Sequence, residues 1–121
     1  MIDSLAACTI YGEMRIRMKD HAGHLHGSAE GAIDVWEPNT WHHVVVTWDP
    51  KRVTLYLDGK EQTRPNKGEQ AGDVVNLPAG GQTKINLGWR FGNWYCDCAI
   101  DELTVHGRAL TAEEVAKRHS S

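Results

Sequence analysis

The sequence predicts an all-β fold of antiparallel strands that ends in one short helix. Three observations support this fold class: a meander over residues 41–63, an alternating strand pattern over residues 13–19 and a helix-start motif at residues 111–114. The chain has 121 residues, of which 40% are hydrophobic and 24% are charged. These values are typical of a globular domain with its own core, so we expect a single domain over residues 1–121.

The meander is the most strongly patterned part of the chain. Residues 41–48 are rich in β-branched and aromatic side chains, which favour strands. Residues 53–57 alternate with period two, and three apolar residues share one face: Val53, Leu55 and Leu57. Asp58-Gly59 supplies the positive φ angles of a tight turn, after which a short strand at residues 61–63 is expected to fold back.

Weaker patterns indicate further strands on both sides of the meander. Residues 13–19 alternate between an apolar face and a basic face, and a strand is expected to run from residue 25 towards residue 35. Residues 85–88 resemble a short strand, whereas residues 64–82 contain two prolines and four glycines and predict a long loop. We assign Trp36 and Trp41 to packing against the core.

The C-terminal strand changes its apolar parity. Cys96, Cys98 and Ile100 share one parity, whereas Leu103 and Val105 share the other. A strand that keeps one face buried across this change needs one extra residue, so we expect a β-bulge near residues 101–102.

The last segment carries the signals of a helix start. Thr111 and Glu114 have the spacing of a capping box, in which each side chain bonds the main-chain amide of the other. Leu110 and Val115 flank this pair as a hydrophobic staple. We therefore expect a helix of about two turns that frays near residue 119.

Two segments of this chain resemble the laminin-G-like domains of the concanavalin A-like lectin/glucanase superfamily. Residues 41–60, which contain W-H-H-V-V-V-T-W-D and L-Y-L-D-G-K, are similar to the central hairpin of that family. Residues 100–115, which contain I-D-E-L-T-V and R-A-L-T-A-E-E-V, are similar to its closing strand and helix. The resemblance implies a two-sheet antiparallel jelly-roll sandwich. It also favours an extracellular or cell-surface protein, although the chain itself starts without a signal peptide.

Members of this family usually begin with further strands, which residues 1–11 are too short to supply. We therefore expect an N-terminally reduced or fragmentary domain. A sheet that lacks an outer strand presents an open edge, and such an edge is a template for pairing with another chain. The sequence therefore predicts a homo-oligomer.

An aromatic loop over residues 89–95 is the predicted ligand-binding site. Aromatic rings stack on the apolar faces of sugars and also anchor protein interfaces, while arginine and asparagine bond hydroxyl groups. The candidate residues are Trp89, Arg90, Asn93, Trp94 and Tyr95. The alternative is that one or two of these rings only close the end of the sandwich.

The leading function is non-catalytic recognition of a glycan or protein surface. The alternative is an assembly module that oligomerises through its open sheet edge, and a glycoside hydrolase is a distant third. Glycosidases place two carboxylates in one cleft, whereas Asp101 and Glu102 are adjacent and point to opposite faces of a strand. We therefore expect no enzyme activity.

Other partners and cofactors find little support. The net charge of −3 does not favour nucleic acid, and no apolar run is long enough to span a membrane. Some relatives bind calcium beside the closing strand, but only three local carboxylates are candidate donors: Asp73, Asp97 and Asp101. The histidines at 21, 24 and 26 are interpreted as turn residues, and His42 and His43 as structural residues, so no metal ligand is predicted.

The three cysteines leave two interpretations open. Cys96 and Cys98 fit small buried hydrophobic residues, and this is the preferred interpretation. A disulfide from Cys8 to one of them is the alternative for an exported domain.

Overall fold

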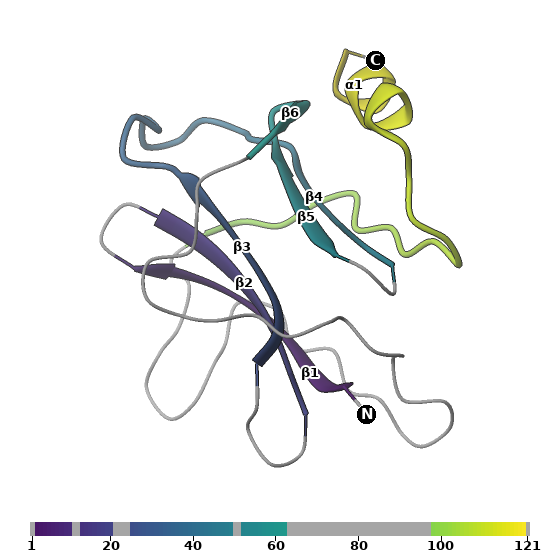
Figure 1. The fold of residues 1–121 in the computed structure, drawn as a ribbon. Coiled ribbons are helices and arrows are strands. Elements are labelled where there is room, and N and C mark those ends of the chain that lie inside the picture. The colour runs from purple at the N-terminus through teal and green to yellow at the C-terminus, as the bar shows by residue number, and fades with distance from the viewer. Residues whose placement is uncertain (1, 11–12, 21–24, 50–51, 63–97, 121) are drawn as a thin grey trace.

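The computed structural model describes residues 2–10, 13–20, 25–49, 52–62 and 98–120 (Figure 1). In the first sheet, side chains are described at positions 14, 16 and 29–32. The described elements are β1 (Ile2–Ile10), β2 (Glu13–Asp20), β3 (Leu25–Ala32), β4 (Val44–Trp48), β5 (Val53–Leu57), β6 (Lys60–Glu61) and α1 (Ala112–Ser120). The strands form two antiparallel sheets, β1-β2-β3 and β4-β5-β6.

The first sheet confirms the predicted strand at residues 13–19 and adds a strand that the sequence analysis did not predict. β1 pairs with β2 along almost its whole length, with Ala7 opposite Ile16, and β2 pairs with β3, with Ile16 opposite Ala29. Residues 1–11 were predicted to be too short to supply further strands, and the small and polar residues of 2–10 give no clear apolar alternation. Pairing along β2 gives this segment its extended conformation.

The second sheet confirms the predicted meander. Val44 pairs with Leu57 and Trp48 with Val53, so β4 and β5 are in full register. Asp58 has φ of 50° and Gly59 has φ of 79°, as expected for the tight turn that joins β5 to β6. The last strand is shorter than expected and occupies Lys60–Glu61.

The two sheets pack face to face and enclose a hydrophobic core. Ile16 of β2 and Ala29 of β3 contact the face of β5 that carries Val53, Leu55 and Leu57. This shared face was predicted from the period-two pattern. A Cβ atom built on Gly31 of β3 would lie 2.7 Å from Leu57 Cδ1, so the sheets approach closely at this glycine. The described strands therefore form two layers of a β-sandwich; the complete jelly-roll order stays a prediction.

The opposite face of β5 is covered by the C-terminal segment. Tyr56 is buried together with Leu110 and Val115, and Val45 of β4 packs against them. The second sheet therefore lies between the first sheet and α1 (Figure 1). The burial of Leu110 beside Val115 confirms the predicted hydrophobic staple.

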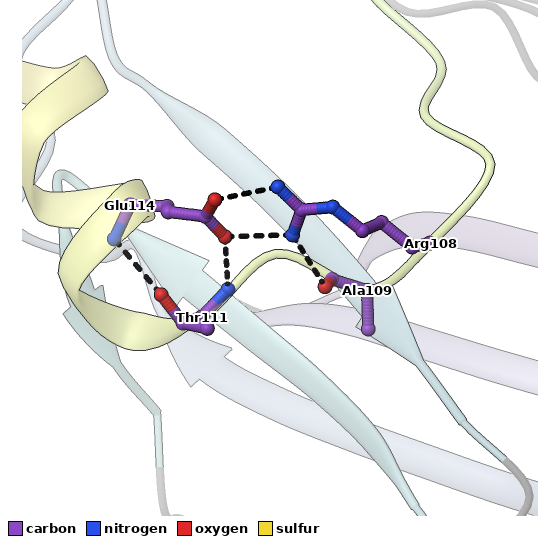
Figure 2. Close-up of polar contacts among 4 residues, drawn as sticks. All are labelled: Arg108, Ala109, Thr111 and Glu114. Carbon is purple, nitrogen blue, oxygen red and sulfur yellow. Dashed lines mark hydrogen bonds and ion pairs between the residues drawn. The ribbon is translucent and has the colours of Figure 1, made fainter.

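Reciprocal hydrogen bonds at the start of α1 confirm the predicted capping box. The Glu114 amide donates to Thr111 Oγ1 at 3.2 Å, and the Thr111 amide donates to Glu114 Oε2 at 2.8 Å. Figure 2 shows a further contact, in which Arg108 donates to both carboxylate oxygens of Glu114 at 2.9 and 2.6 Å. This second contact, which was not predicted, links the chain before the helix to its first turn.

The arginine contact gives the helix start a defined pH dependence. The hydrogen bonds from Arg108 and from the Thr111 amide lower the pKa of Glu114 from 4.5 to about 2. The folded state favours the carboxylate form of Glu114. The stability that this carboxylate contributes to the fold is therefore fully present above pH 4.5 and is lost as the pH falls from 4.5 to about 2.

We expect an NMR titration of the Glu114 carboxyl carbon to show a midpoint pH of about 2. Arg108→Ala should raise this midpoint towards 4.5, because the hydrogen bonds from Arg108 are the largest cause of the lowered pKa. Arg52→Ala, which removes a 3.4 Å ion pair with Glu61 on the second sheet, is the matched control and should leave the midpoint unchanged. A wild-type midpoint close to 4.5 would contradict the prediction.

The expected C-terminal strand is absent from residues 98–105, which form no strand in the structure. Ile100, Leu103 and Val105 are more than half exposed, at 51%, 57% and 70%, so the predicted buried face is wrong for this segment. No described strand pairs with these residues, and β-branched composition alone does not form a strand without a neighbour. The expected bulge position does contain an irregularity, because Glu102 has φ of 52°.

Within the described ranges, no helix is long and apolar enough to cross a membrane.

Candidate functional site

The predicted aromatic loop lies outside the described residues. Its five candidates, Trp89, Arg90, Asn93, Trp94 and Tyr95, therefore stay a prediction. The same holds for Asp73 and Asp97 as calcium donors and for the turn histidines His21 and His24. The prediction is wrong for His26, which lies in β3 because this segment pairs with β2. The described part of the chain offers a different aromatic loop, between β3 and β4.

The two ends of this connection meet through stacked rings. Trp36 and His42 stack in parallel, with ring centroids 3.8 Å apart and an interplanar angle of 1°. Trp36 is half-buried and packs against the core between the sheets, as predicted. The stack therefore anchors a loop of five residues, 37–41, which we call the Trp41 loop.

Asp58 holds the His42 side of the stack. Its Oδ2 lies 2.8 Å from His42 Nδ1, and its Oδ1 accepts the His43 amide at 2.9 Å. The Asp58 amide in turn donates to the His43 carbonyl at 2.8 Å. The regular ladder of β4 begins at Val44 and not at Trp41 as predicted, and the His43 amide just before it donates to the side chain of Asp58.

Burial raises the pKa of Asp58, but the hydrogen bonds from His42 and the His43 amide, with the charges of His42 and His119, oppose it. The net result is a pKa below the ordinary 3.8. The carboxylate form is thus favoured in the folded state. The stability that it contributes is present above pH 3.8 and is lost as the pH falls further.

All five side chains of the Trp41 loop are exposed: Glu37, Pro38, Asn39, Thr40 and Trp41. Trp41 is 68% exposed, so its assignment to packing is wrong. The physical reason is that Trp41 lies before the first residue of β4, so its side chain belongs to the β3–β4 connection and not to the sheet. Asn39 has φ of 61°, a left-handed conformation that asparagine tolerates better than most residues and that turns the loop.

The loop combines an exposed indole with a carboxylate, an amide and a hydroxyl. An indole face can stack on the apolar face of a sugar ring, and the three polar groups can bond hydroxyls. This loop was not predicted because Trp41 stands first in a run of strand-forming residues. The signal that could have found it is the Pro38-Asn39 turn pair between two tryptophans.

The histidines have the structural contacts that were expected of them. His42 stacks on Trp36, and the His43 ring lies 5.8 Å from the His119 ring of α1. Among the described residues, no group of three or more His, Cys, Asp or Glu side chains could hold a metal ion.

Cys98 is disulfide-bonded and exposed, which contradicts its preferred interpretation as a small buried hydrophobic residue. The physical reason is that residues 98–105 join neither sheet. Cys96 and the side chain of Cys8 lie outside the described residues, so the predicted pairing with Cys8 stays open.

Comparisons with known proteins gave one similar structure and one matching family model. The chain is similar to a solved S-layer domain-containing protein from Clostridium thermocellum, with 21% identity and a TM-score of 0.46. That alignment covers 89% of this chain and 52% of the other, so the chain spans about half the length of that structure. Comparison with the curated proteins gave no match. A laminin G family model, described as the concanavalin A-like lectin/glucanases superfamily, matches residues 9–116. The chain therefore belongs to the concanavalin A-like lectin/glucanases superfamily.

Proposed function

We propose that the chain is a non-catalytic carbohydrate-binding module and that Trp41 stacks on a sugar ring of its ligand. The observation that carries this proposal is the 68% exposure of Trp41 on a loop whose base is held by stacked rings. Exposed aromatic residues on loops of a rigid sheet are typical of binding sites. Membership in a lectin-like superfamily supports a sugar as the ligand.

The non-catalytic part of the proposal rests on the acidic residues of the closing segment. Asp101 and Glu102 are adjacent and both exposed, and the Glu102 amide donates to Asp101 Oδ1 at 2.8 Å. A glycosidase needs two carboxylates that face one sugar across a cleft. The adjacent pair favours a local turn over such a role.

The test is a glycan array with the wild-type protein, Trp41→Ala and Trp94→Ala, each with calcium and with a chelator. We expect wild-type binding that falls at least about tenfold in Trp41→Ala, because a lost aromatic contact costs about 1.4 kcal/mol or more. Val35→Ala is the matched control, since Val35 is 79% exposed on the same connection outside the loop. Unchanged binding by Trp41→Ala with lost binding by Trp94→Ala would assign the site to residues 89–95 instead.

Absence of glycan binding by folded wild-type protein would favour the second candidate, an assembly module. The observation behind that candidate is β4, whose residues carry no charge and which has β5 as its one described strand neighbour. Uncharged edge strands tend to pair with other chains. Light scattering would then show a homo-oligomer.

A further inference from the structure

We propose that Asp58 and His42 are positioning residues for ligand binding: they hold the Trp41 loop in the conformation that binds. This inference rests on the proposed function and concerns the same loop. Neither residue belongs to the loop, and both act through contacts at its base.

The first end of the loop is held by the core. The Trp36 amide donates to the Ile33 carbonyl at 3.0 Å, and the Trp36 ring packs against the core between the sheets. Because both the main chain and the ring of Trp36 are held in place, the His42 ring can stack on a fixed indole.

The second end is held by Asp58. One carboxylate fixes two consecutive residues, through His42 Nδ1 at 2.8 Å and the His43 amide at 2.9 Å. The His42 ring has 18% of its surface exposed and lies flat on Trp36, so the imidazole has contacts on one face and at its edge. Rotation of this ring away from Trp36 would break the bond to Asp58 and the stack together.

These contacts lower the cost of binding. Ordering a loop costs conformational entropy, and a loop that is already ordered does not incur this cost when the ligand binds. If loss of the contacts left about a tenth of the molecules in the binding conformation, the apparent affinity would fall about tenfold.

Asp58→Gly is the informative variant. It removes both hydrogen bonds, yet a Gly-Gly pair keeps the tight turn, because glycine adopts φ of 50° without strain. Asp58→Asn should partly rescue binding, since asparagine tolerates this φ and its carbonyl can still accept the His43 amide. Asp49→Gly is the matched control: Asp49 accepts the Arg52 amide at 3.0 Å in the turn at the other end of β4.

The experiment measures amide hydrogen exchange and the affinity for the glycan that the wild-type protein binds most strongly on the array, both well below the melting temperature of each variant. We expect Asp58→Gly to bind about tenfold more weakly and to exchange faster at the amides of residue 37 and residues 39–41, with the amides of β4 and β5 unchanged. Asp49→Gly should match the wild type in both readouts. If folded Asp58→Gly binds the glycan as tightly as the wild type does, only this inference is overturned. If the wild-type protein itself binds no glycan, the proposed function is overturned as well.

Discussion

Leu55→Ala is expected to lower the free energy of unfolding by about 2–5 kcal/mol. Leu55 is fully buried on β5, at the centre of the core that β2 and β3 share with this strand. Truncation removes three methyl or methylene-sized groups from a position that both sheets enclose, and it leaves a cavity that the rigid strands fill only in part.

Urea denaturation measures this effect, with Leu103→Ala as the matched control. Leu103 is 57% exposed in the closing segment, so the same substitution there should change the free energy of unfolding by less than about 0.5 kcal/mol. Equal losses in both variants would mean that the two sheets do not share the core described above.

Gly31→Val is expected to destabilise the fold by about 1–3 kcal/mol, for the opposite reason. A Cβ atom at this position would lie 2.7 Å from Leu57 Cδ1 and 2.8 Å from Gln62 Cγ. Leu57 is buried at 5% exposure, so it cannot move aside without disturbing the core. The added side chain must therefore push β3 away from β5.

Gly107→Val is the matched control for overpacking, because a Cβ atom at Gly107 would meet no atom within 4 Å. Thermal unfolding of both variants separates the steric effect from the general effect of replacing glycine. If Gly31→Val has the same melting temperature as the wild type, the close approach of the two sheets is wrong.

The parts of the fold that local patterns determine could be predicted from the sequence. The apolar face of residues 53–57 and the Asp58-Gly59 turn follow from period-two alternation and from backbone preference. The capping box of Thr111 and Glu114 follows from a spacing of three residues. In each case neighbouring residues along the chain supply the physical cause.

The parts that depend on distant partners could not be predicted. β1 is a strand because β2 lies beside it, and residues 98–105 are not a strand because no described strand does. Trp41 was predicted to pack in the core, but it lies before β4. The His43 amide between Trp41 and β4 donates to Asp58, which is distant in the sequence. The Trp41 loop was missed for the same reason, since its base is a contact between Trp36 and a histidine that Asp58 orients.

The burial of β5 on both faces restricts how this sequence can change over time. Residues Val53–Leu57 are all buried, with alternate positions facing the first sheet and the C-terminal segment. Strands at the surface of a protein usually have one face on which polar replacements are neutral. This strand has no such face. Substitutions at the four of its positions that belong to one of the two separate cores therefore need compensating substitutions in that core; these positions are Val53, Leu55, Tyr56 and Leu57.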